Sequence, residues 1–520
     1  MRSTWWPAIA LAAGCTGYIS GNGNGSGGSQ DAGVSTDDGG EPTGAGALVS
    51  ETFPDSLLQP YTGPANTDFD DTFLRYPQLQ NKIKAIFNDA WIRGGVDQFA
   101  ARIALFGGVD FVTNFLEARG ATSDYLLAVD AMAKDVCGQA TTAKTGPFAT
   151  IDATAIGTGA TETTKIDQLY QKVLYRSASP TELTAGTTLL SDLTGLGSTP
   201  QDAWAGLCEG LIHSQDFLFT LAPSIASTTG AAHDKLMLVR IAQDLVARPP
   251  TQAELDALAN GSQTLSTLVD LYLSSNEFRD WFFNRMRIKT QSTGSVASDE
   301  PARLWTYLAT QSLPFKNLFV SDYSVDPNWN MLARTPEHAG TGILSMAGFI
   351  DDKPGLPHYT YAARVLGDYM GVTFEVPASV IPLRVNATAA STVQPGTLCF
   401  QCHQILTPLA YQRGRWADDG TYQTTDAQGQ AIDDSDQGLV ATYPFKGEGL
   451  AAFASQAVKK EAFIRRMFDA QYLLTVGRNM RAYDDERVIY KQLWDLNVAS
   501  NGDLKQIIKA IVMSPAYQAN

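Results

Sequence analysis

The stretch WAGLCEGLIHSQDF, residues 204–217, carries the pattern that decides the fold of this chain. Its larger apolar residues follow the spacing i, i+3, i+4, i+7, i+8, which places them on one face of a helix, and a Ser-x-x-aromatic tail comes directly after them. The same pattern returns in LSTLVDLYLSSNEF at 265–278 and in LKQIIKAIVMSPAY at 504–517. The repetition predicts one helical module used three times, with the stripe residues in the core.

An arginine and a glutamate recur upstream of these helices. In the first two copies another apolar stripe ends just before the arginine, and the glutamate follows six residues later. The pairs are Arg176 with Glu182 and Arg248 with Glu254, and Gly477-Arg478 closes a looser third copy. Each module is therefore expected to be a helical hairpin whose turn is fixed by an ion pair. Such hairpins cannot cover their own apolar faces, so they are expected to pack on one another or on a central body.

Residues 291–450 interrupt the helical pattern. They are rich in Pro, Gly, Thr and Asp, and they contain Cys399-Phe400-Gln401-Cys402-His403. A C-x-x-C-H cluster is the attachment motif of covalent haem, because two thiols three positions apart can add to the vinyl groups of one porphyrin while the adjacent imidazole binds the iron. The motif predicts one covalent haem c, held by Cys399 and Cys402, with His403 as the proximal iron ligand.

Two other uses of this cluster are a redox dithiol and half of a zinc site. A zinc site needs a second ligand pair, but the other four histidines stand singly and the chain has no second C-x-x-C. The dithiol remains the alternative to haem.

The chain after the haem motif carries two further signals. Pro408 either shapes the backbone beside the porphyrin or ends a helix. Residues 414–433 contain Tyr422-Gln423-Thr424 and then Asp426-Ala427-Gln428-Gly429-Gln430 with its glycine turn, which predicts a small β-hairpin.

The N-terminus has the layout of an export signal. Residues 1–14 contain Arg2, a short apolar run and then small residues before Cys15. Residues 11–15, LAAGC, resemble the lipobox of bacterial lipoproteins, in which the cysteine is lipidated, although the usual leucine lies one place closer to that cysteine. Residues 17–50 have the Gly/Ser-rich composition of a flexible tether. We expect an exported, lipid-anchored protein on the periplasmic or cell-surface side, as an outer-membrane lipoprotein. A cleaved signal on a free periplasmic protein is the alternative, and it leaves Cys15 unexplained.

Two cysteines remain once lipid and haem have been assigned. Cys137 and Cys208 form an even pair, and export places them in an oxidising compartment where a disulfide can form. The alternative is two separate buried thiols, because Cys208 lies on a predicted apolar stripe and free cysteine is commonly buried.

The overall charge argues against nucleic acid as a partner. The chain has 38 Lys and Arg against 54 Asp and Glu, which gives a formal charge of 38 − 54 = −16, and no basic cluster stands out. About 470 residues remain after the tether, and with a hydrophobic content of 44% over the whole chain they are enough for several lobes.

Several stretches resemble the planctomycete-type cytochrome c family, which comprises exported bacterial proteins with one haem domain flanked by helical domains of unknown function. The stretches are FVTNFLEARGATSDYLLAVDAMAKDVC at 111–137, VLYRSASPTEL at 173–183, HAGTGILSMAGF at 338–349, the CFQCH, GRW and AIDD elements from residue 399 onward, and residues 463–517. The resemblance implies electron transfer, although no reaction is firmly assigned to that family. This chain departs from it at 406–409, where Leu-Thr-Pro-Leu replaces the usual Met-Asp-Pro-Gly.

The sixth iron ligand would decide what the haem can do. A methionine or a second histidine gives a closed electron carrier, whereas an open position admits small molecules. The candidates are Met346, His358, Met370, Met480 or no side chain at all. Spacing does not choose among them, and Met346 is slightly preferred because it lies in the family-like stretch before the haem motif.

The predicted fold is mainly α, with helical hairpin modules and an inserted irregular haem-binding lobe that carries a small β-hairpin. The expected segments are a signal peptide at 1–14, a lipidated cysteine and linker at 15–50, a helical domain at 51–160, two repeat modules at 161–290, the haem lobe at 291–450 and a C-terminal module at 451–520. The leading function is one-electron transfer with redox protein partners, which makes the chain a carrier rather than a catalyst. The alternatives are a haem enzyme of peroxidase or oxygenase type and a surface scaffold with haem as an accessory cofactor.

Overall fold

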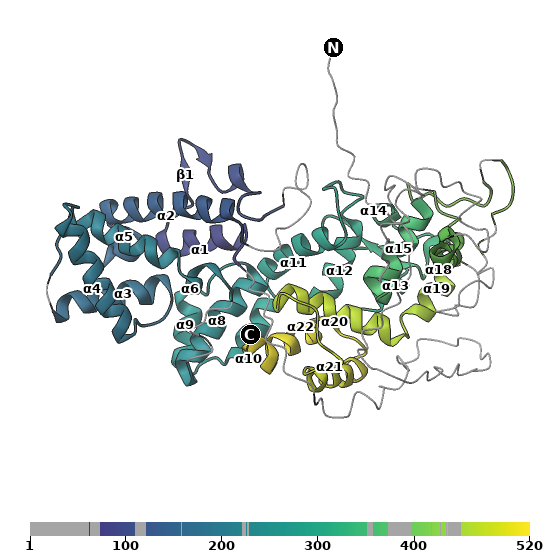
Figure 1. Ribbon diagram of the computed structural model, residues 1–520. Helices are drawn as coiled ribbons and strands as arrows, with labels where there is room; N and C mark the ends of the chain where they lie inside the picture. Colours follow the sequence, from purple (N-terminus) through teal and green to yellow (C-terminus); the bar gives the residue numbers. More distant parts are fainter. Residues whose placement is uncertain are drawn as a thin grey trace, which may run out of the picture. The chain divides into compact units, whose positions relative to one another are not determined.

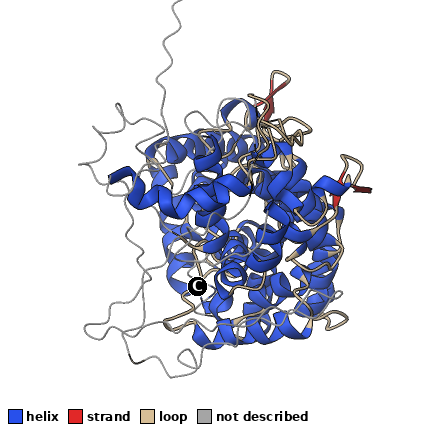
Figure 2. Ribbon diagram, turned by 90° about the vertical axis from the view of Figure 1, so that its right-hand side faces the viewer, coloured by secondary structure: helices blue, strands red, loops and turns tan. Residues whose placement is uncertain are grey.

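The computed structural model describes the chain from residue 62 onward, with gaps. The described residues are 62, 73–109, 121–157, 159–220, 225, 228–350, 357–372, 398–417, 419–426, 428–432, 434 and 449–519. The predicted signal peptide, Cys15 and the linker lie outside them. The structure is 62% helix and 5% strand, which confirms the mainly α prediction (Figure 2). Its described sheets are two antiparallel pairs, β1 (Ile92–Arg93) with β2 (Val96–Asp97) and β3 (Tyr323–Val325) with β4 (Met331–Ala333).

The chain divides into two compact units. Unit 1 contains Ser295–Asp469 and Lys491–Leu504, and unit 2 contains Tyr61–Gly294, Ala470–Tyr490 and Lys505–Asn520. This division differs from the expected one, because residues 451–520 do not form one module. The chain passes from unit 1 into unit 2 within α20 (Glu461–Thr475) and returns to unit 1 within α21 (Arg487–Ala499).

The described part of unit 2 is mainly helical (Figure 1). They are α1 (Gln78–Phe87), η2 (Ala100–Arg102), α2 (Ser123–Ala143), η3 (Gly146–Ala149), α3 (Ala160–Val173), α4 (Pro180–Gly195), α5 (Pro200–Ile212), α6 (Gln215–Leu218), α8 (Gly230–Val246), α9 (Gln252–Ala259), α10 (Leu265–Leu273) and α11 (Asn276–Lys289), with α22 (Leu504–Val512) and α23 (Pro515–Ala519) from the end of the chain.

Unit 1 contains the segment that carries the haem motif. Its helices are α12 (Glu300–Thr310), α13 (Asn317–Val320), η4 (Pro336–His338), η5 (Gly342–Ser345), α14 (Ala347–Ile350), α15 (Pro357–Met370), α18 (Leu398–Gln412) and α19 (Gly449–Ala457), together with parts of α20 and α21. None of the described helices in either unit is long and apolar enough to span a bilayer.

The three stripes that the sequence predicts are helices with buried faces. They form α5, α10 and α22, and their stripe residues are buried, except that Leu265 is half-buried. The paired arginines and glutamates also meet as predicted. Arg176 donates to both carboxylate oxygens of Glu182, at 2.9 and 2.6 Å, and this contact holds the pKa of Glu182 down at about 2. Arg248 donates to both oxygens of Glu254, at 3.0 and 3.1 Å.

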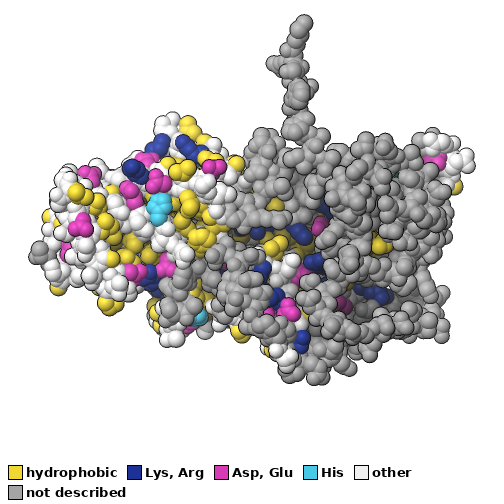
Figure 3. Space-filling view, viewed as in Figure 1, with side chains coloured by type: hydrophobic (Ala, Val, Ile, Leu, Met, Phe, Trp, Pro, Cys, Tyr) yellow, Lys and Arg dark blue, Asp and Glu magenta, His cyan; other side chains and the backbone are white. Residues whose placement is uncertain are grey.

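The described surface mixes charges of both signs. On the face drawn in Figure 3, Lys and Arg side chains alternate with Asp and Glu side chains over unit 2. Some of these charges are paired, such as Arg93 with Asp89 and Asp135, at 2.8 and 2.7 Å. Partly exposed pairs of this kind add little to stability, so the fold depends mainly on its apolar core.

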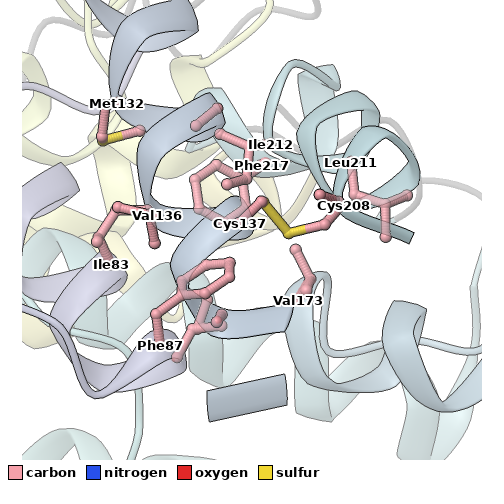
Figure 4. Packing of buried hydrophobic residues seen from close by; sticks show 14 of the residues in the cluster. Ile83, Phe87, Met132, Val136, Cys137, Val173, Cys208, Leu211, Ile212 and Phe217 are labelled. Carbon is pink, nitrogen blue, oxygen red and sulfur yellow. A yellow bond between two sulfur atoms is a disulfide. The ribbon is translucent and has the colours of Figure 1, made fainter. Parts of the chain in front are cut away.

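Cys137 and Cys208 form a disulfide in the core of unit 2. Cys137 lies on α2 and Cys208 on α5, both are fully buried, and their Cα atoms are 5.9 Å apart (Figure 4). The pairing that the sequence left open is therefore present. The bridge joins two helices that already pack side by side among Ile83, Phe87 and Val173.

The C-terminal helix α23 is held on α8 by a buried polar cluster. The Tyr517 hydroxyl donates to Asp244 at 2.7 Å, and Arg240 donates to the Tyr517 carbonyl at 2.5 Å while its guanidinium lies 4.0 Å from the centre of the Tyr517 ring. Arg240 Nε is 3.8 Å from Asp244. Burial raises the pKa of Asp244 to about 6, although Arg240 and the Tyr517 hydrogen bond oppose that rise.

This cluster should make the unfolding free energy depend on pH. Because the folded-state pKa of Asp244 lies above its unfolded value, the folded protein holds the extra proton between about pH 4 and 6, and stability should fall as pH rises through that window. Asp244→Asn should remove this loss, because asparagine does not titrate. Between pH 4 and pH 7 the wild type should therefore lose about 2 kcal/mol of unfolding free energy relative to the variant. Denaturant unfolding at several pH values measures it. A pH-independent difference would contradict the assignment.

Candidate haem-attachment site

The haem motif lies at the start of α18 in unit 1. Residues 399, 402 and 403 fall in its first two turns, and the helical spacing i, i+3, i+4 puts the three positions on one side of the helix. Their side chains lie outside the described residues, as do the chain segments on either side, 373–397 and 435–448. The donor set of two thiols and an imidazole on one helical face fits a covalently attached haem.

Pro408 lies inside α18, and the helix continues to Gln412. The prediction that Pro408 ends a helix is therefore wrong. Proline removes one backbone donor and normally weakens a helix interior, so tertiary packing must hold this helix together. The packing is present, because Leu406 and Leu409 on either side of Pro408 are only 5% and 4% exposed.

α15 packs against α18. Its first turn lies beside the last turns of α18, because Arg413 Nη1 donates to His358 Nδ1 at 2.7 Å and the Thr407 hydroxyl lies 3.5 Å from that of Tyr359. At a rise of about 1.5 Å per residue, the ten residues from His403 to Arg413 place these two residues about 15 Å apart along the helix. His358 therefore contacts the end of α18 that is farther from the haem motif.

Met346 lies near the same end of α18 as His358. It is 1% exposed at the junction of η5 and α14. The neighbouring Leu344 carbonyl accepts from Tyr361 on the first half of α15, at 3.0 Å, and a Cβ placed on Gly420, beyond the end of α18, would lie 3.0 Å from Ala347. These contacts link the Met346 segment to the first half of α15 and to the turn that follows α18.

The other two candidate ligands lie elsewhere. Met370 is the last residue of α15, at the opposite end from His358, and is 1% exposed. The printed contacts of α15 with α18 involve the first turns of α15 and the C-terminal half of α18, so Met370 is the candidate farthest along α15 from those contacts. Met480 belongs to unit 2 and is 6% exposed.

The predicted β-hairpin at 414–433 takes the form of two successive tight turns. Isolated antiparallel bridges join Trp416 to Tyr422 and Thr425 to Ala431. The first turn contains Gly420 and the second Gly429, with φ of +80° and +77°. The segment is closed at its base by an ion pair of 2.7 Å between Arg415 and Asp434, which joins the GRW and AIDD elements of the sequence.

His338 fixes the first of these turns to the preceding family-like stretch. Its Nε2 lies 3.2 Å from the Gly420 carbonyl, and its Nδ1 lies 3.0 Å from the Thr335 hydroxyl. Both ring nitrogens therefore have neighbours, and the imidazole ring packs edge-on to Trp416 at 6.4 Å. This histidine has a structural role in the described fold.

Outside the haem motif, the part of the chain that the structure describes contains no group of three His, Cys, Asp or Glu side chains placed to hold a metal ion. No protein-family model, curated protein or solved structure matches the chain. The chemistry of the site is therefore argued from the motif and from the surroundings of α18.

Proposed function

We propose that the chain is an exported, membrane-anchored mono-haem c-type cytochrome that transfers single electrons to and from protein partners. The observation that carries the proposal is the C-x-x-C-H motif, set at the start of a helix with its three functional positions on one side. Its resemblance to the planctomycete-type cytochrome c family and the lipobox-like LAAGC at 11–15 support the same proposal.

The residues of the motif have distinct roles in this proposal. Cys399 and Cys402 would hold the porphyrin through two thioether bonds, and His403 would bind the iron through Nε2. Bound haem supplies an Fe(III)/Fe(II) couple, which is sufficient for one-electron transfer. The protein's part is to fix the iron ligands, to tune their hydrogen bonds and to keep the porphyrin edge close to the surface.

Replacing both Cys399 and Cys402 by alanine should abolish covalent haem. The wild type, made in a host competent for cytochrome maturation, should carry one haem by intact mass and keep its colour after denaturation, whereas the double variant should lose both features because its thioether bonds cannot form. Cys137→Ala serves as the control, since that thiol lies in the unit 2 core and the variant should keep its haem. Wild-type protein without added haem mass would refute the proposal.

Met370 is the sixth iron ligand that the arrangement of α15 and α18 supports best. Met370→Ala should convert a low-spin oxidised spectrum to high spin, remove the long-wavelength Fe–thioether band and open the iron to CO in the reduced state. Met346→Ala and His358→Ala are matched controls that should leave the spectrum unchanged, because both residues lie toward the other end of α18. A low-spin spectrum that persists in Met370→Ala would exclude this ligand.

The same spectra separate the carrier from the haem enzyme. A wild-type protein that ignores CO and cyanide supports the carrier, because a closed iron has no position for a substrate. Rapid ligand binding by the wild type would instead favour an enzyme with an open distal site. Absence of any redox partner together with a closed iron would favour the scaffold function.

A further inference from the structure

The three Arg–Glu turns of unit 2 are built alike, including the third, in which the sequence spacing differs. Arg478 donates through Nη1 and Nη2 to the two oxygens of Glu486 at 2.9 and 2.7 Å, as Arg176 does to Glu182. Each arginine also donates through Nη1 to the carbonyl of the residue after it, namely Ser177, Pro249 and Asn479. Each follows a residue with a left-handed backbone, namely Tyr175, Ala247 and Gly477.

In the first two turns a second carboxylate accepts a hydrogen bond from the arginine Nε. Arg176 Nε donates to Asp216 at 2.7 Å, and Arg248 Nε donates to Glu277 at 2.9 Å. Both acids occupy the second position of the helix that follows the module's terminal serine, in Ser-Gln-Asp-Phe at 214–217 and Ser-Asn-Glu-Phe at 275–278. The sequence pattern alone did not reveal this contact, because each acid lies 29 to 40 residues from its arginine.

The third module has alanine where the other two have an acid. Its tail is Ser-Pro-Ala-Tyr at 514–517, so the methyl group of Ala516 replaces the side chains of Asp216 and Glu277. Arg478 is only 9% exposed, and its buried Nε has no acceptor among the described residues. A buried donor without an acceptor costs about 1 to 3 kcal/mol, so a ligand that satisfies it gains affinity from removing that cost.

A hydrogen-bond donor also lies close to Arg478. Tyr472 lies close to the Arg478–Glu486 pair, and burial, together with the Glu486 charge, raises the pKa of its hydroxyl. The hydroxyl therefore stays protonated at neutral pH. Ala516 is half-buried and Pro515 beside it is exposed, so the position lies near the surface of unit 2.

We propose that the Nε edge of Arg478 is a binding site for a carboxylate group that does not belong to this module's own tail. The ligand is a small organic acid or the acidic side chain of another protein, since both present the same group. The size of the ligand that fits follows from the acids of the other two modules. Beyond the Cβ atom that Ala516 retains, Asp216 adds a carboxylate, which formate reproduces, and Glu277 adds one more carbon, which acetate reproduces.

Formate and acetate are the probes for this site. The thermal unfolding midpoint of the full chain should rise by a few degrees, in a saturable way, with sodium formate or acetate compared with sodium chloride at equal ionic strength. Ala516→Asp should raise the midpoint without any additive and lose the response, because its own carboxylate takes the place of the ligand. Ala259→Asp, which adds the same charge at an exposed position on α9, should keep the response. A wild type that responds equally to chloride, or an Ala516→Asp variant that still responds to formate, would overturn the proposal.

A second comparison tests the same geometry at the first module. Asp216→Ala should leave Arg176 with Glu182 alone, lower the midpoint, and make it newly responsive to formate. Failure of formate to restore any stability in this variant would show that the turn does not accept a free carboxylate. It would overturn the proposal even if the wild-type response had another cause.

The source of the carboxylate is distinguished by a third titration, with N-acetyl-glutamate amide, which carries a glutamate side chain and no other charge. Stabilisation of the wild type as strong as that by acetate would assign the site to an acidic side chain of a protein partner. A response to formate and acetate alone would assign it to a small organic acid. Binding of none of the three probes would refute the site.

Discussion

Replacing Cys137 and Cys208 together by alanine is expected to lower the free energy of unfolding of unit 2 by about 4 kcal/mol, the loop-closure value for a bridge across 71 residues. The bridge acts mainly on the unfolded chain, whose conformations it restricts, and the native contacts of α2 with α5 remain. Both positions are fully buried, so the loss of two sulfur atoms adds a smaller packing cost. Denaturant unfolding followed by far-UV circular dichroism measures the change.

Reduction supplies the control for this prediction. A reducing agent should lower the stability of the wild type toward that of the double variant and should leave the double variant unchanged. Cys137→Ala alone should leave Cys208 as a free thiol, which a thiol reagent detects after unfolding. Equal unfolding midpoints for wild type and double variant under oxidising conditions would contradict the predicted role of the bridge.

Gly342→Ala is expected to destabilise unit 1 by roughly 3 to 5 kcal/mol, which is at the upper end for a single substitution. Two costs add at this position. Its φ of +46° lies in the left-handed region, which L side chains disfavour by about 1 to 2 kcal/mol. An added Cβ would also overlap the Leu318 carbonyl oxygen and lie 2.7 Å from the carbonyl carbon of Phe319, so the backbone of α13 would have to move.

Gly367→Ala is the matched control in the same unit. It lies within α15, where the added Cβ would make only an ordinary contact of 3.5 Å with the Val372 carbonyl, and alanine is favoured over glycine inside a helix by up to about 1 kcal/mol. The control should therefore be neutral or stabilising. A Gly342→Ala variant as stable as Gly367→Ala would show that η5 and α13 do not approach each other as closely as described.

The close approach of Gly342 explains part of the family-like stretch HAGTGILSMAGF. Gly348, six residues on, meets the backbone of Ala297 and Ser298, where a Cβ would lie 2.6 Å from the Ser298 Cα atom. From the sequence these glycines indicated only a turn-rich segment. Glycine is needed at both positions because another backbone segment lies directly beside it. That closeness depends on contacts between residues that are distant along the chain.

The site shows the same limit of sequence reasoning. The C-x-x-C-H motif predicts which residues would attach haem, because that chemistry needs those residue types at that spacing. Spacing could not choose among Met346, His358, Met370 and Met480. A choice among them depends on which end of α18 each residue approaches, and that is set by contacts between distant residues such as His358 and Arg413, 55 residues apart.

The sequence by itself determined the local elements of this protein: the three apolar stripes, the Arg–Glu turns and the haem motif. Each of these depends on residues within one or two helical turns, whose spacing fixes which side chains share a face. Only the tertiary structure decided that Asp216 and Glu277 accept hydrogen bonds from Arg176 and Arg248. It also decided that Pro408 is tolerated inside α18 and that residues 451–520 are divided between two units. These outcomes depend on packing between distant segments, because burial and long-range partners outweigh local preference once helices pack together.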